Sequence, residues 1–532
     1  MISICLFIFS FSIIVQVIKS LVLKWSLSNQ TFIKIRVATN NSCHSFYLLF
    51  LIPQLIAQFF INIFHKSLRN NKFPRVLPFA EFSLTLWSQN KKSSILNDMA
   101  KVAIKYDNIV PYGGIFYAMN EFKRAGLDKL VDGLLNLRCA NYGYQYSDIM
   151  LALFCIYLCG GDHIEDITTI LNKYLSTAPD TRIPSSDTIA RGLKELSAMS
   201  IAYTSKAGNV YAHDPAMKLN SLMLDMALLL GLLKKGQGID VDFDNEFIPA
   251  EKSDALYSYK KQRGYFPGVM TSGPLIIGIE NRQGNSNVKF EQVEELTRML
   301  DNIEAHGLYV SMFRADCGSF IKELVEELFL RTETFYLRAS SCADRRQMYE
   351  QCKDWRHTSV NGQDMDVASF EFTEFLSDWH LRLVVQRTKM DAEQGERFLP
   401  GMEYMYRAIL TSDHNSTEEQ VIDKYNQRGA CEKNFDVQNN DFGWAHLPFS
   451  TMEDNTVFLL FTAMLKNFYQ YLLSKVSAIF PGIDMKSRLK RFVFAFIVVP
   501  AKWVRVARQW TLNIYTKSRW LHYWTIFNAS YG

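Results

Sequence analysis

The stretch Gly238-Ile-Asp-Val-Asp-Phe-Asp-Asn-Glu246 alternates carboxylates with apolar side chains. Its aspartates Asp240, Asp242 and Asp244 fall at every second position, with branched or aromatic residues between them. Alternation with a period of two predicts a β-strand that has one acidic face and one apolar face. Such a strand also occurs as an ordinary solvated sheet edge, so it indicates a site only if other acidic residues join it.

Two further acids stand in different local contexts. Asp316 follows the apolar run 308–313 and precedes Cys317-Gly318, a pattern typical of a strand that ends in a turn. Glu432 closes the stretch Tyr425-Asn-Gln-Arg-Gly-Ala-Cys-Glu432 on a predicted helix. Three carboxylates that converge from two strands and a helix suit a pair of hard divalent cations. Two such ions stabilise both the attacking and the leaving oxygen of a phosphoryl transfer.

The helix that carries Glu432 is predicted from its start signal. Thr417-Glu-Glu-Gln420 has the form of a capping box. Helical residues turn by about 100° each, so Tyr425, Arg428 and Glu432 lie within roughly 60° of one another, and Asn439 joins them if the helix continues. A tyrosine, an arginine and a glutamate on one stripe favour an active-site face, although Tyr425 and Arg428 would also cover an ordinary helix flank.

Taken together, these residues resemble a DDE-type insertion-sequence transposase, most closely of the insertion sequence 1380 family. That family is related to a group with a Tyr-x2-Arg-x3-Glu-x6-Lys signature, of which Tyr425, Arg428 and Glu432 match the first three positions. Asn439 replaces the lysine, which puts one cationic DNA contact in doubt. Phe313–Gly318 and Asp240–Asp244 resemble the two aspartate strands. The resemblance covers about residues 99 to 525.

The resemblance implies an α/β fold, with a ribonuclease H-like core interrupted by a β-rich insertion and flanked by helical N- and C-terminal regions. It implies metal-dependent DNA strand cleavage and strand transfer at insertion-sequence ends. Two Mg²⁺ ions, for which Mn²⁺ can substitute, would be held by Asp242, Asp316 and Glu432, with Asp240 as the alternative first acid. Tyr425 and Arg428 would then orient DNA at the scissile phosphate.

Further DNA contacts are predicted outside the acidic residues. Ser185 or Ser186 caps a helix that presents Arg191 outward and resembles the second helix of a helix-turn-helix unit. Lys260 and Lys261 lie in a basic and aromatic patch. Each feature is also compatible with a solvated protein surface. The tail from Lys486 onward interleaves Lys and Arg with Trp, which suits a phosphate backbone as well as a packed helix with a solvated face.

Composition limits the class of protein. The chain has 532 residues, enough for about three or four structural units, and its nine cysteines show no paired spacing of a zinc site or a disulfide framework. The net charge is +4, but residues 1–98 carry ten Lys or Arg against two acids, which leaves −4 for the remainder. Nucleic-acid binding must therefore be argued from local patches. These features favour a cytoplasmic protein at the bacterial nucleoid.

Residues 1–98 lack glycine and hold two apolar runs, Ile2–Ile18 and Phe46–Ile63. The first run is a poor signal peptide, and Pro53 interrupts the second, so a membrane anchor is the weaker reading. Because Met99 begins a stretch that resembles the usual start of these transposases, we interpret residues 1–98 as an upstream extension or hydrophobic leader. No membrane partner is expected.

The predicted organisation has six parts. They are an extension at 1–98, a helical DNA-binding region at 99–235, the first part of the core at 236–330, a β-rich insertion at 331–403, the second part of the core with the glutamate helix at 404–455, and a helical basic region at 456–532. The expected partners are double-stranded DNA, as terminal inverted repeats and target, and a second subunit on paired ends. The alternative is an inactive or domesticated ribonuclease H-like DNA-binding protein or nuclease that does not transpose.

Overall fold

The structure is a computed structural model. It describes residues 32–39, 42–49, 103–105, 107–140, 142–179, 181–391, 393, 397 and 401–531. The chain divides into two compact units, Met1–Tyr106 and Asp107–Gly532.

In the first unit the described residues form an antiparallel pair of strands, β1 (Phe32–Thr39) and β2 (Ser42–Leu49). The predicted apolar run 2–18 lies outside the described residues, as does most of the run 46–63. Throughout the part of the chain that the structure describes, no helix combines the length and apolarity needed to cross a membrane.

The second unit begins with a group of packed helices. They are α4 (Ile115–Arg124), α5 (Leu127–Leu135), α6 (Tyr146–Leu158), a π-helical turn (Ile167–Leu171), α7 (Asn172–Leu175) and α8 (Ser186–Lys194). Helix α6, which lies in the region 99–235 predicted to be helical, is buried along nearly its whole length. Ser185 is the N-cap of α8, and its hydroxyl accepts a hydrogen bond from the Thr188 amide. Gly192 lets α8 pack closely on α6, because a Cβ there would lie 2.1 Å from Ile149 Cδ1.

The region predicted to be helical also contains a β-hairpin. Strands β3 (Ile201–Thr204) and β4 (Val210–Asp214) pair antiparallel and precede α9 (Met217–Leu229). Strand β4 pairs in turn with β10 (Leu275–Arg282), so the hairpin extends the central sheet. Aromatic residues Tyr203 and Tyr211 face each other across the hairpin, in keeping with the strand preference of such side chains.

One mixed sheet of eleven strands runs through the second unit, in the order β13-β14-β15-β16-β12-β11-β5-β9-β10-β4-β3. Its centre contains β5 (Gly238–Asn245), β9 (Gly268–Ser272), β10, β11 (Tyr309–Ala315) and β12 (Thr332–Arg338). Strands β5, β11 and β12 are parallel neighbours, whereas β9 pairs antiparallel with both β5 and β10.

The predicted alternation on β5 decides which helices cover which face. Ile239, Val241 and Phe243 are buried in a cluster with apolar residues of α10 (Gln292–Ala305) and α11 (Lys322–Arg331). The aspartates therefore face the opposite side of the sheet. Beside the sheet stands a small three-stranded sheet of β6 (Ile248–Pro249), β8 (Arg263–Tyr265) and β7 (Leu256–Tyr257).

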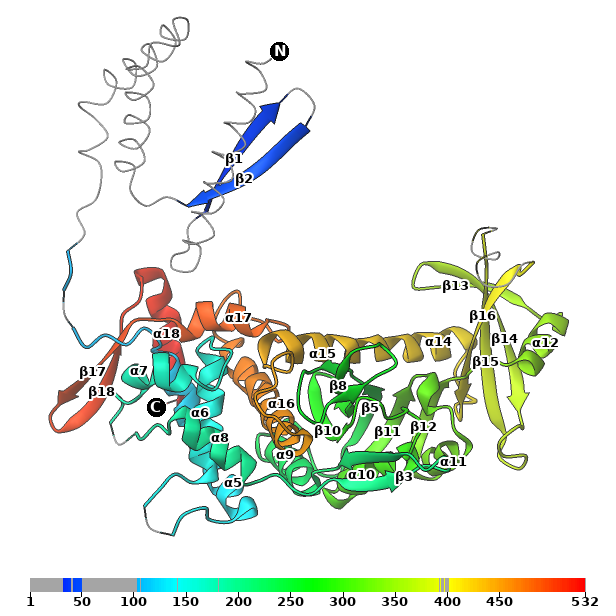
Figure 1. Cartoon of the computed structure of the whole chain (residues 1–532), viewed down its shortest axis with the longest axis horizontal. Coiled ribbons are helices and arrows are strands. Elements are labelled where there is room, and N and C mark those ends of the chain that lie inside the picture. The colour runs from blue at the N-terminus through cyan, green and yellow to red at the C-terminus, as the bar shows by residue number, and fades with distance from the viewer. Residues whose placement is uncertain are drawn as a thin grey trace, which may run out of the picture. The chain divides into compact units, whose positions relative to one another are not determined.

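A β-rich part follows β12 and extends beyond the end of the predicted insertion at 331–403. It consists of α12 (Ala343–Gln351), β13 (Arg356–Val360), β14 (Gln363–Phe372), β15 (Leu381–Lys389) and β16 (Tyr404–Thr411). Strand β16 pairs with β15 on one side and β12 on the other, so this part continues the central sheet. In the second unit, β13–β16 lie at the opposite end from α4–α8 (Figure 1).

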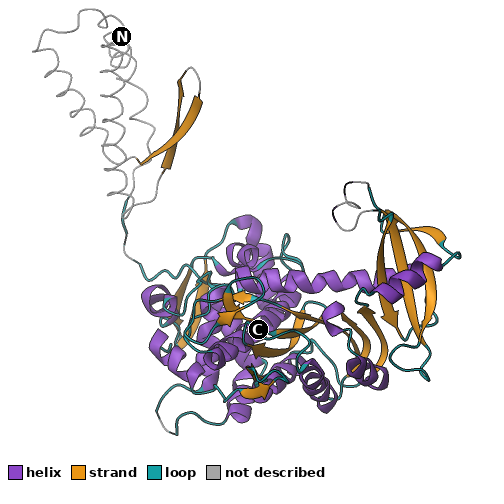
Figure 2. Cartoon of the chain, turned by 45° about the vertical axis from the view of Figure 1, so that its right-hand side comes forward, coloured by secondary structure: helices purple, strands orange, loops and turns teal. Residues whose placement is uncertain are grey.

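The helix predicted from Thr417 is confirmed with its capping box, since Thr417 Oγ1 accepts from the Gln420 amide and Gln420 Oε1 accepts from the Thr417 amide. It forms α14 (Glu418–Asn426), a 3₁₀ turn (Gln427–Gly429) and α15 (Ala430–Asp441). The segment runs from the β13–β16 end to the central strands (Figures 1 and 2).

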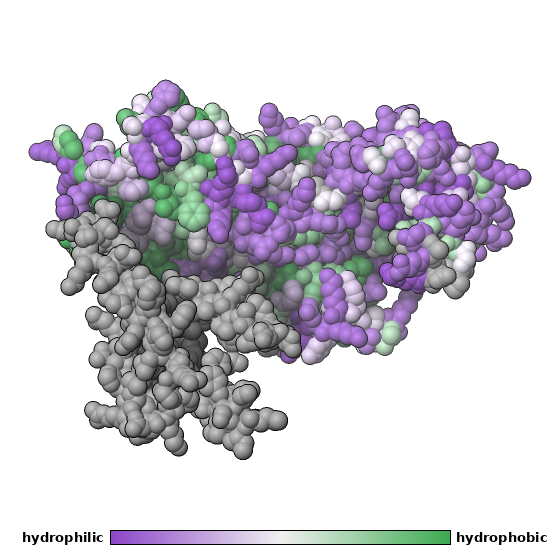
Figure 3. Space-filling model, turned by 90° about the horizontal axis from the view of Figure 1, so that it is seen from above, coloured by the Kyte–Doolittle hydropathy of each residue, from purple (hydrophilic) through white to green (hydrophobic). Residues whose placement is uncertain are grey.

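The C-terminal part supplies the core helix and a second unpredicted hairpin. Helix α16 (Met452–Val476) lies mostly in the region 456–532 predicted to be helical, and it is almost entirely buried. It is followed by α17 (Leu489–Phe492), a π-helical turn (Val493–Ile497), β17 (Ala501–Val506), β18 (Gln509–Ile514) and α18 (Ser518–Tyr531). The tail, predicted to be helical, therefore contains a β-hairpin. Its strands include Trp503–Val506 and Trp510–Ile514, which are rich in the β-branched and aromatic residues that favour strands. Figure 3 shows apolar surface at this end and mainly hydrophilic surface over β13–β16.

Candidate active site

The ends of two parallel strands bring two aspartates together. The register pairs Arg314 with Asp242 and Ala315 with Phe243, so Asp316, the residue after β11, follows in line with Asp244, which still pairs with Val269 of β9. The negative charge of Asp316 repels that of Asp244 and contributes to the raised pKa of the Asp244 carboxyl. Carboxyl ends of parallel strands are a common location for functional residues in such sheets.

The turn after β11 fixes Asp316 locally. Its Oδ1 accepts a hydrogen bond of 2.8 Å from the Gly318 amide, and its side chain caps the 3₁₀ turn Cys317–Ser319. The Asp316 side chain is only half-buried. It is therefore oriented by the backbone while one of its oxygens stays available to a ligand.

The α14–α15 segment brings Arg428 and Glu432 to the same place. Arg428 Nη1 donates to Asp244 Oδ2 over 2.7 Å, and Arg428 Nη2 lies 3.8 Å from Glu432 Oε1. The Glu432 side chain is 69% exposed, whereas that of Asp244 is 20% exposed. Asp244, Asp316 and Glu432 thus come from the two strands and the helix predicted from the sequence.

The electrostatics of Asp244 and Arg428 are coupled. Burial raises the pKa of Asp244, the guanidinium of Arg428 opposes that shift, and the carboxylate of Asp316 adds to it. Burial disfavours the charge of Arg428, but the attraction of Asp244 outweighs it, so the pKa of Arg428 is raised. Arg428 therefore neutralises part of the carboxylate charge between the strand ends and Glu432.

A fourth carboxylate, Glu246, borders this cluster. Asn439 Nδ2 donates to Glu246 Oε1 over 3.0 Å, so the residue that replaces the expected lysine faces an acid. Burial raises the pKa of Glu246, the Asn439 hydrogen bond and the charge of Lys260 lower it, and Asp244 and Glu432 raise it. Lys260 is exposed and close enough to act on this cluster, and Lys261 stands beside it in the turn with a φ of 59°.

Asp242, the residue predicted as the first catalytic acid, lies in a different environment. It is 3% exposed, and Arg314 Nε and Nη2 donate to its two carboxylate oxygens over 2.6 and 3.0 Å. Arg314 Nη1 also donates to the Lys424 carbonyl at the end of α14 over 2.9 Å. Both oxygens of Asp242 are therefore engaged in a buried ion pair that joins β5, β11 and α14.

The alternative first acid, Asp240, lies at the other end of the strand. Its side chain is exposed and accepts a hydrogen bond of 2.9 Å from Ser311 Oγ. Of the three aspartates of β5, only Asp244 reaches the strand end next to Asp316. The sequence interpretation chose Asp242 because it lies at the centre of the acidic stretch. It did not take into account where the strand ends, which favours Asp244.

Tyr425 and an additional arginine complete the cationic side of the site. Tyr425 is 6% exposed, and its ring lies 5.0 Å from the guanidinium of Arg338 and 5.9 Å from that of Arg428. Burial lowers the pKa of Arg338, Tyr425 opposes this, and the charges of Arg407 and Arg428 add to it. Arg338 ends β12 and has no sequence signal of its own; only the parallel pairing of β12 with β11 places it here.

Arg191, predicted to contact DNA, does not belong to this cluster. It is exposed on α8, in the helical part of the unit, where Lys194 of the same helix lies 4.0 Å from Asp454. The structure therefore separates the predicted DNA-binding residues into a group around the acids and a distant group on α8.

The donor atoms around Asp244 suit a divalent cation, but their arrangement includes a protein cation. Carboxylate oxygens are the ligands that Mg²⁺ prefers. In the described part of the chain, no three His, Cys, Asp or Glu side chains are placed to hold a metal ion. The reason is visible in the contacts of Arg428, which lies between Asp244 and the exposed Glu432.

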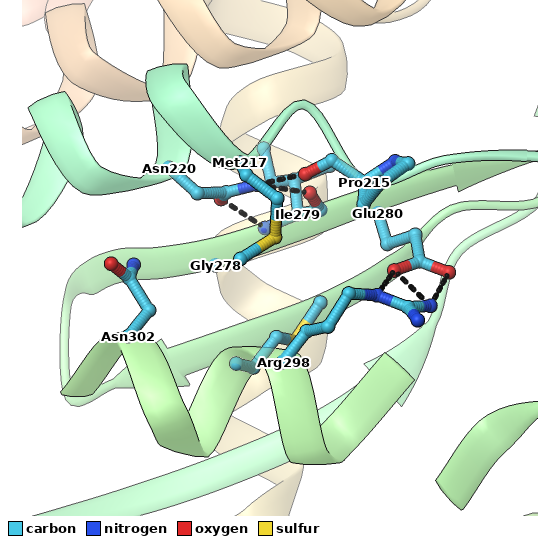
Figure 4. A pocket seen from close by; sticks show the side chains of 9 residues that line it. Pro215, Met217, Asn220, Gly278, Ile279, Glu280, Arg298 and Asn302 are labelled. Carbon is cyan, nitrogen blue, oxygen red and sulfur yellow. Dashed lines mark hydrogen bonds and ion pairs between the residues drawn. The ribbon is translucent and has the colours of Figure 1, made fainter. Parts of the chain in front are cut away.

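The two cavities of the described unit lie elsewhere. One of about 10 Å³ is lined by residues of β10, α9 and α10. There, Asn220 bonds to Pro215 and Ile279, and Arg298 binds both oxygens of Glu280 (Figure 4). The other, of about 410 Å³, is lined by His163 and His446 among other residues. Neither of these two cavities includes the acids at the strand ends.

This arrangement of acids agrees with a family comparison. Residues 97–519 match the model of the family described as "Transposase DDE domain group 1". Because the match spans most of the sequence, the chain belongs to this family. Its membership supports the resemblance to a DDE-type transposase at the level of the class.

Among solved structures, the chain is similar to the piggyBac transposase in a cryo-EM structure of its synaptic complex with hairpin DNA. The TM-score is 0.39 with 12% sequence identity, over 72% of this chain and 79% of that chain. No curated protein gives a significant match.

Proposed function

We propose that this protein is a transposase that cleaves DNA strands and transfers them at the ends of an insertion sequence of the 1380 family. The observation that carries the proposal is the placement of Asp244 and Asp316 near the ends of two neighbouring parallel strands, with Arg428 linking Asp244 to Glu432 on the helix. Family membership supports the same class of function. The proposed catalytic acids therefore differ from the sequence prediction in one residue, since Asp244 takes the place of Asp242.

The central strands support a ribonuclease H-like core. Their order is β10-β9-β5-β11-β12, with an antiparallel hairpin β9–β10 on one side of β5 and parallel strands β11 and β12 on the other. Helices α10 and α11 pack on the apolar face of β5, which leaves the acidic face to α14 and α15. The β13–β16 part enters between the second and third acids and adjoins α14, where it would grip a DNA end.

Asp244, Asp316 and Glu432 would hold two Mg²⁺ ions, or Mn²⁺ in their place. Bound metal would supply a lowered pKa for the attacking water or 3′-hydroxyl and stabilisation of the leaving oxygen. For the acids to converge, Arg428 leaves Asp244 and the exposed Glu432 side chain turns toward the strand ends. Asp316 needs no such change, because the Gly318 amide already orients it.

The released Arg428 and the half-buried Arg338 would bind phosphates of the strand to be cut. Both guanidiniums lie against the ring of Tyr425 and beside the acids, and Arg338 Nη1 is buried without a hydrogen-bond partner. Guanidinium groups form strong charge-assisted hydrogen bonds with phosphate. Asn439, Lys260 and Lys261 would line the neighbouring side of the DNA, and Arg191 would contact it further away.

The three aspartates of β5 offer a matched series that tests the assignment. Asp240→Asn, Asp242→Asn and Asp244→Asn remove the same charge from successive positions of one face of one strand. We expect Asp244→Asn to lose cleavage of a labelled terminal-repeat duplex in Mg²⁺ by about 10³-fold or more, as do Asp316→Asn and Glu432→Gln, with binding retained. Asp240→Asn should cleave like the unaltered protein.

Metal binding gives a second measurement that does not depend on activity. Thermal unfolding followed with Mg²⁺ or Mn²⁺ should show a rise in Tm for the unaltered protein that is absent for Asp244→Asn. The assignment would be wrong if Asp244→Asn cleaved fully and kept the metal-dependent rise in Tm, while a well-folded Asp242→Asn lost both. In that case Asp242 would be the first catalytic acid.

A further inference from the structure

The end of the chain is strongly basic. After Asp484 the sequence contains no acidic residue up to Gly532. The same stretch contains the cations Lys486, Arg488, Lys490, Arg491, Lys502, Arg505, Arg508, Lys517 and Arg519. A surface with this charge imbalance attracts an anionic polymer.

The structure divides these cations into two groups. Arg488 pairs with Asp436 and Asp441 over 2.5 and 2.7 Å, and Lys502 pairs with Asp107 over 2.8 Å. These two residues therefore fasten the tail to the rest of the unit. Arg505 and Arg508 belong to the other group, because both are exposed at the far end of the β17–β18 hairpin.

The hairpin is fixed at its base. Val110 and Ala501 exchange two backbone hydrogen bonds of 2.8 Å, and Ala501 is fully buried. The ring of Trp503 packs edge-on against Phe116 with 5.2 Å between the centroids. A ribbon anchored in this way holds its tip in a defined direction, and Figure 1 shows it at the end of the unit away from β13–β16.

The tip is exposed on every side. All residues from Arg505 to Thr511 are exposed, and Val506 and Trp510 keep 61% and 49% of their surface. Arg505 lies opposite Trp510 in the register, with its guanidinium 5.8 Å from the indole ring. An apolar tip that carries only positive charge lacks any partner inside the described unit.

The turn of the hairpin is strained. Val506 pairs with Gln509, so Ala507 and Arg508 form a two-residue loop, with φ values of 49° and 70°. Positive φ at both positions corresponds to a type I′ turn, for which Asn-Gly is the favoured sequence. Backbone strain of this kind is found where a side chain has to be held in place for function. Here it projects Arg508 from the tip.

We propose that the β17–β18 ribbon inserts its tip into the major groove of duplex DNA, at a distance from the acidic residues. A two-stranded ribbon fits the major groove, which is about 12 Å wide and presents a distinct edge pattern for each base pair. Arg505 and Arg508 bind phosphates or guanine edges, and Gln509 is placed to bind an adenine edge. This inference rests on the proposed function, because it supplies a second contact to the same DNA.

The test compares two double variants of equal charge change. Arg505→Ala with Arg508→Ala removes the ribbon cations, and Lys206→Ala with Lys218→Ala removes two exposed lysines from the β3–β4 turn and α9. Binding of a fluorescein-labelled mixed-sequence duplex is measured by anisotropy in EDTA over a range of salt. The ribbon variant should bind at least about tenfold more weakly and its salt slope should fall by about 2, whereas the control stays within about twofold.

A third variant keeps the ribbon folded. Ala507→Asn with Arg508→Gly supplies the preferred turn sequence, so it should unfold at the same or a higher temperature while its salt slope falls by about 1. Equal binding by the ribbon variants and the control would overturn the proposal. So would a ribbon variant that binds DNA normally but sediments as a smaller species, because the tip would then contact a second copy of the chain. Neither outcome depends on catalysis, so loss of cleavage in Asp316→Asn tests the proposed function separately.

Discussion

Asp242 and Asp244 are chemically identical and two positions apart, but their neighbours give them different roles. Asp242 is buried with both oxygens bound by Arg314, whereas Asp244 stands at the strand end with Asp316 and Arg428. A buried carboxylate in a bidentate pair is poorly suited to exchange its partner for a metal ion, because breaking the pair leaves a charge buried without a partner or solvent. The Asp242–Arg314 pair instead positions the strands and α14.

This reasoning gives a stability prediction for Arg314. Arg314→Met leaves the Asp242 carboxylate buried without its partner and should lower the free energy of unfolding by about 3–5 kcal/mol. Chemical denaturation followed by tryptophan fluorescence measures the change. The double variant Arg314→Met with Asp242→Leu also removes the unpaired buried carboxylate. It should therefore recover most of the lost free energy of unfolding. If the double variant is as unstable as the sum of both single variants, the two side chains act independently.

Lys466 gives a prediction with a defined pH dependence. It is buried in α16 and donates to the Pro274 carbonyl and, over 2.8 Å, to Asn434 Oδ1, and burial lowers its pKa from 10.5 to about 7. Between pH 7 and 10 the unfolded chain therefore holds a proton that the folded chain releases, so this residue makes the folded state more stable as pH rises.

Lys466→Met cannot titrate and should lack this slope. From pH 7 to 10, the unfolding free energy of the unaltered protein should rise relative to that of Lys466→Met by on the order of 3 kcal/mol. Lys475→Met, on the same helix but at a partly exposed position, serves as the control. If the difference in unfolding free energy did not change with pH, Lys466 would stay protonated through its hydrogen bonds to the Pro274 carbonyl and Asn434 Oδ1.

At the scale of elements, the attachment of α14 to the β13–β16 part depends on Glu418. Its carboxylate accepts hydrogen bonds of 2.8 Å from Ser369, Arg356 and Arg382. Burial opposes the charge of Glu418, but these donors lower its pKa from 4.5 to about 2. The stabilisation is therefore present above about pH 4.5 and is lost as pH falls toward 2.

Glu418→Gln should weaken this attachment at neutral pH. Because the side chain is 21% exposed, the expected loss is modest, about 1 kcal/mol, and should vanish as the pH approaches 2. Hydrogen exchange of β13 and β14 amides, compared at pH 7 and pH 3, measures the effect where it arises. A loss that is unchanged in acid would mean that packing, not charge, joins the two elements.

Much of the element pattern could be predicted from the sequence. The alternation on β5, the apolar helices within α6 and α16 and the capping box at Thr417 all depend on local patterns, and all are present. The hairpins β3–β4 and β17–β18 were missed, because each is short and bounded by helical sequence. Their strands are stabilised by distant partners: β4 pairs with β10, and Ala501 pairs with Val110.

The candidate site shows the same limit. Local patterns identified Asp316, Arg428 and Glu432, but the choice among three aspartates depended on where β5 ends relative to β11. That register is a property of the sheet and not of the stretch 238–246. The position of Arg338 beside the site could not be predicted, because it depends on the pairing of β12 with β11. The role of Arg314 could not be predicted either, because it depends on contacts with both β5 and α14.

At the scale of the whole molecule, the described unit contains one set of the three proposed catalytic acids. A reaction that cuts two DNA ends and joins them to one target needs two such sets at a fixed separation, which a symmetric pair of subunits provides. Within the unit, exposed Arg191 on α8 and Arg505 on the ribbon lie in the part away from β13–β16, whereas the acids lie at the central strands (Figure 1). We therefore expect a DNA end held by α8 or the ribbon of one subunit to be cut by the acids of the other.

Mixing two defective proteins tests this arrangement. Glu432→Gln keeps its DNA contacts but lacks an acid, and Arg191→Ala keeps its acids but binds the end weakly, so each should cleave a terminal-repeat duplex poorly alone. If a subunit binds one end and cuts the other, an equal mixture forms mixed pairs in which the intact acids act on the end held by the intact helix, and part of the cleavage returns. Measuring product formation across mixing ratios should give a maximum near equal amounts. Cleavage that never exceeds the sum of the separate proteins at any ratio would show that each subunit cuts the end it holds.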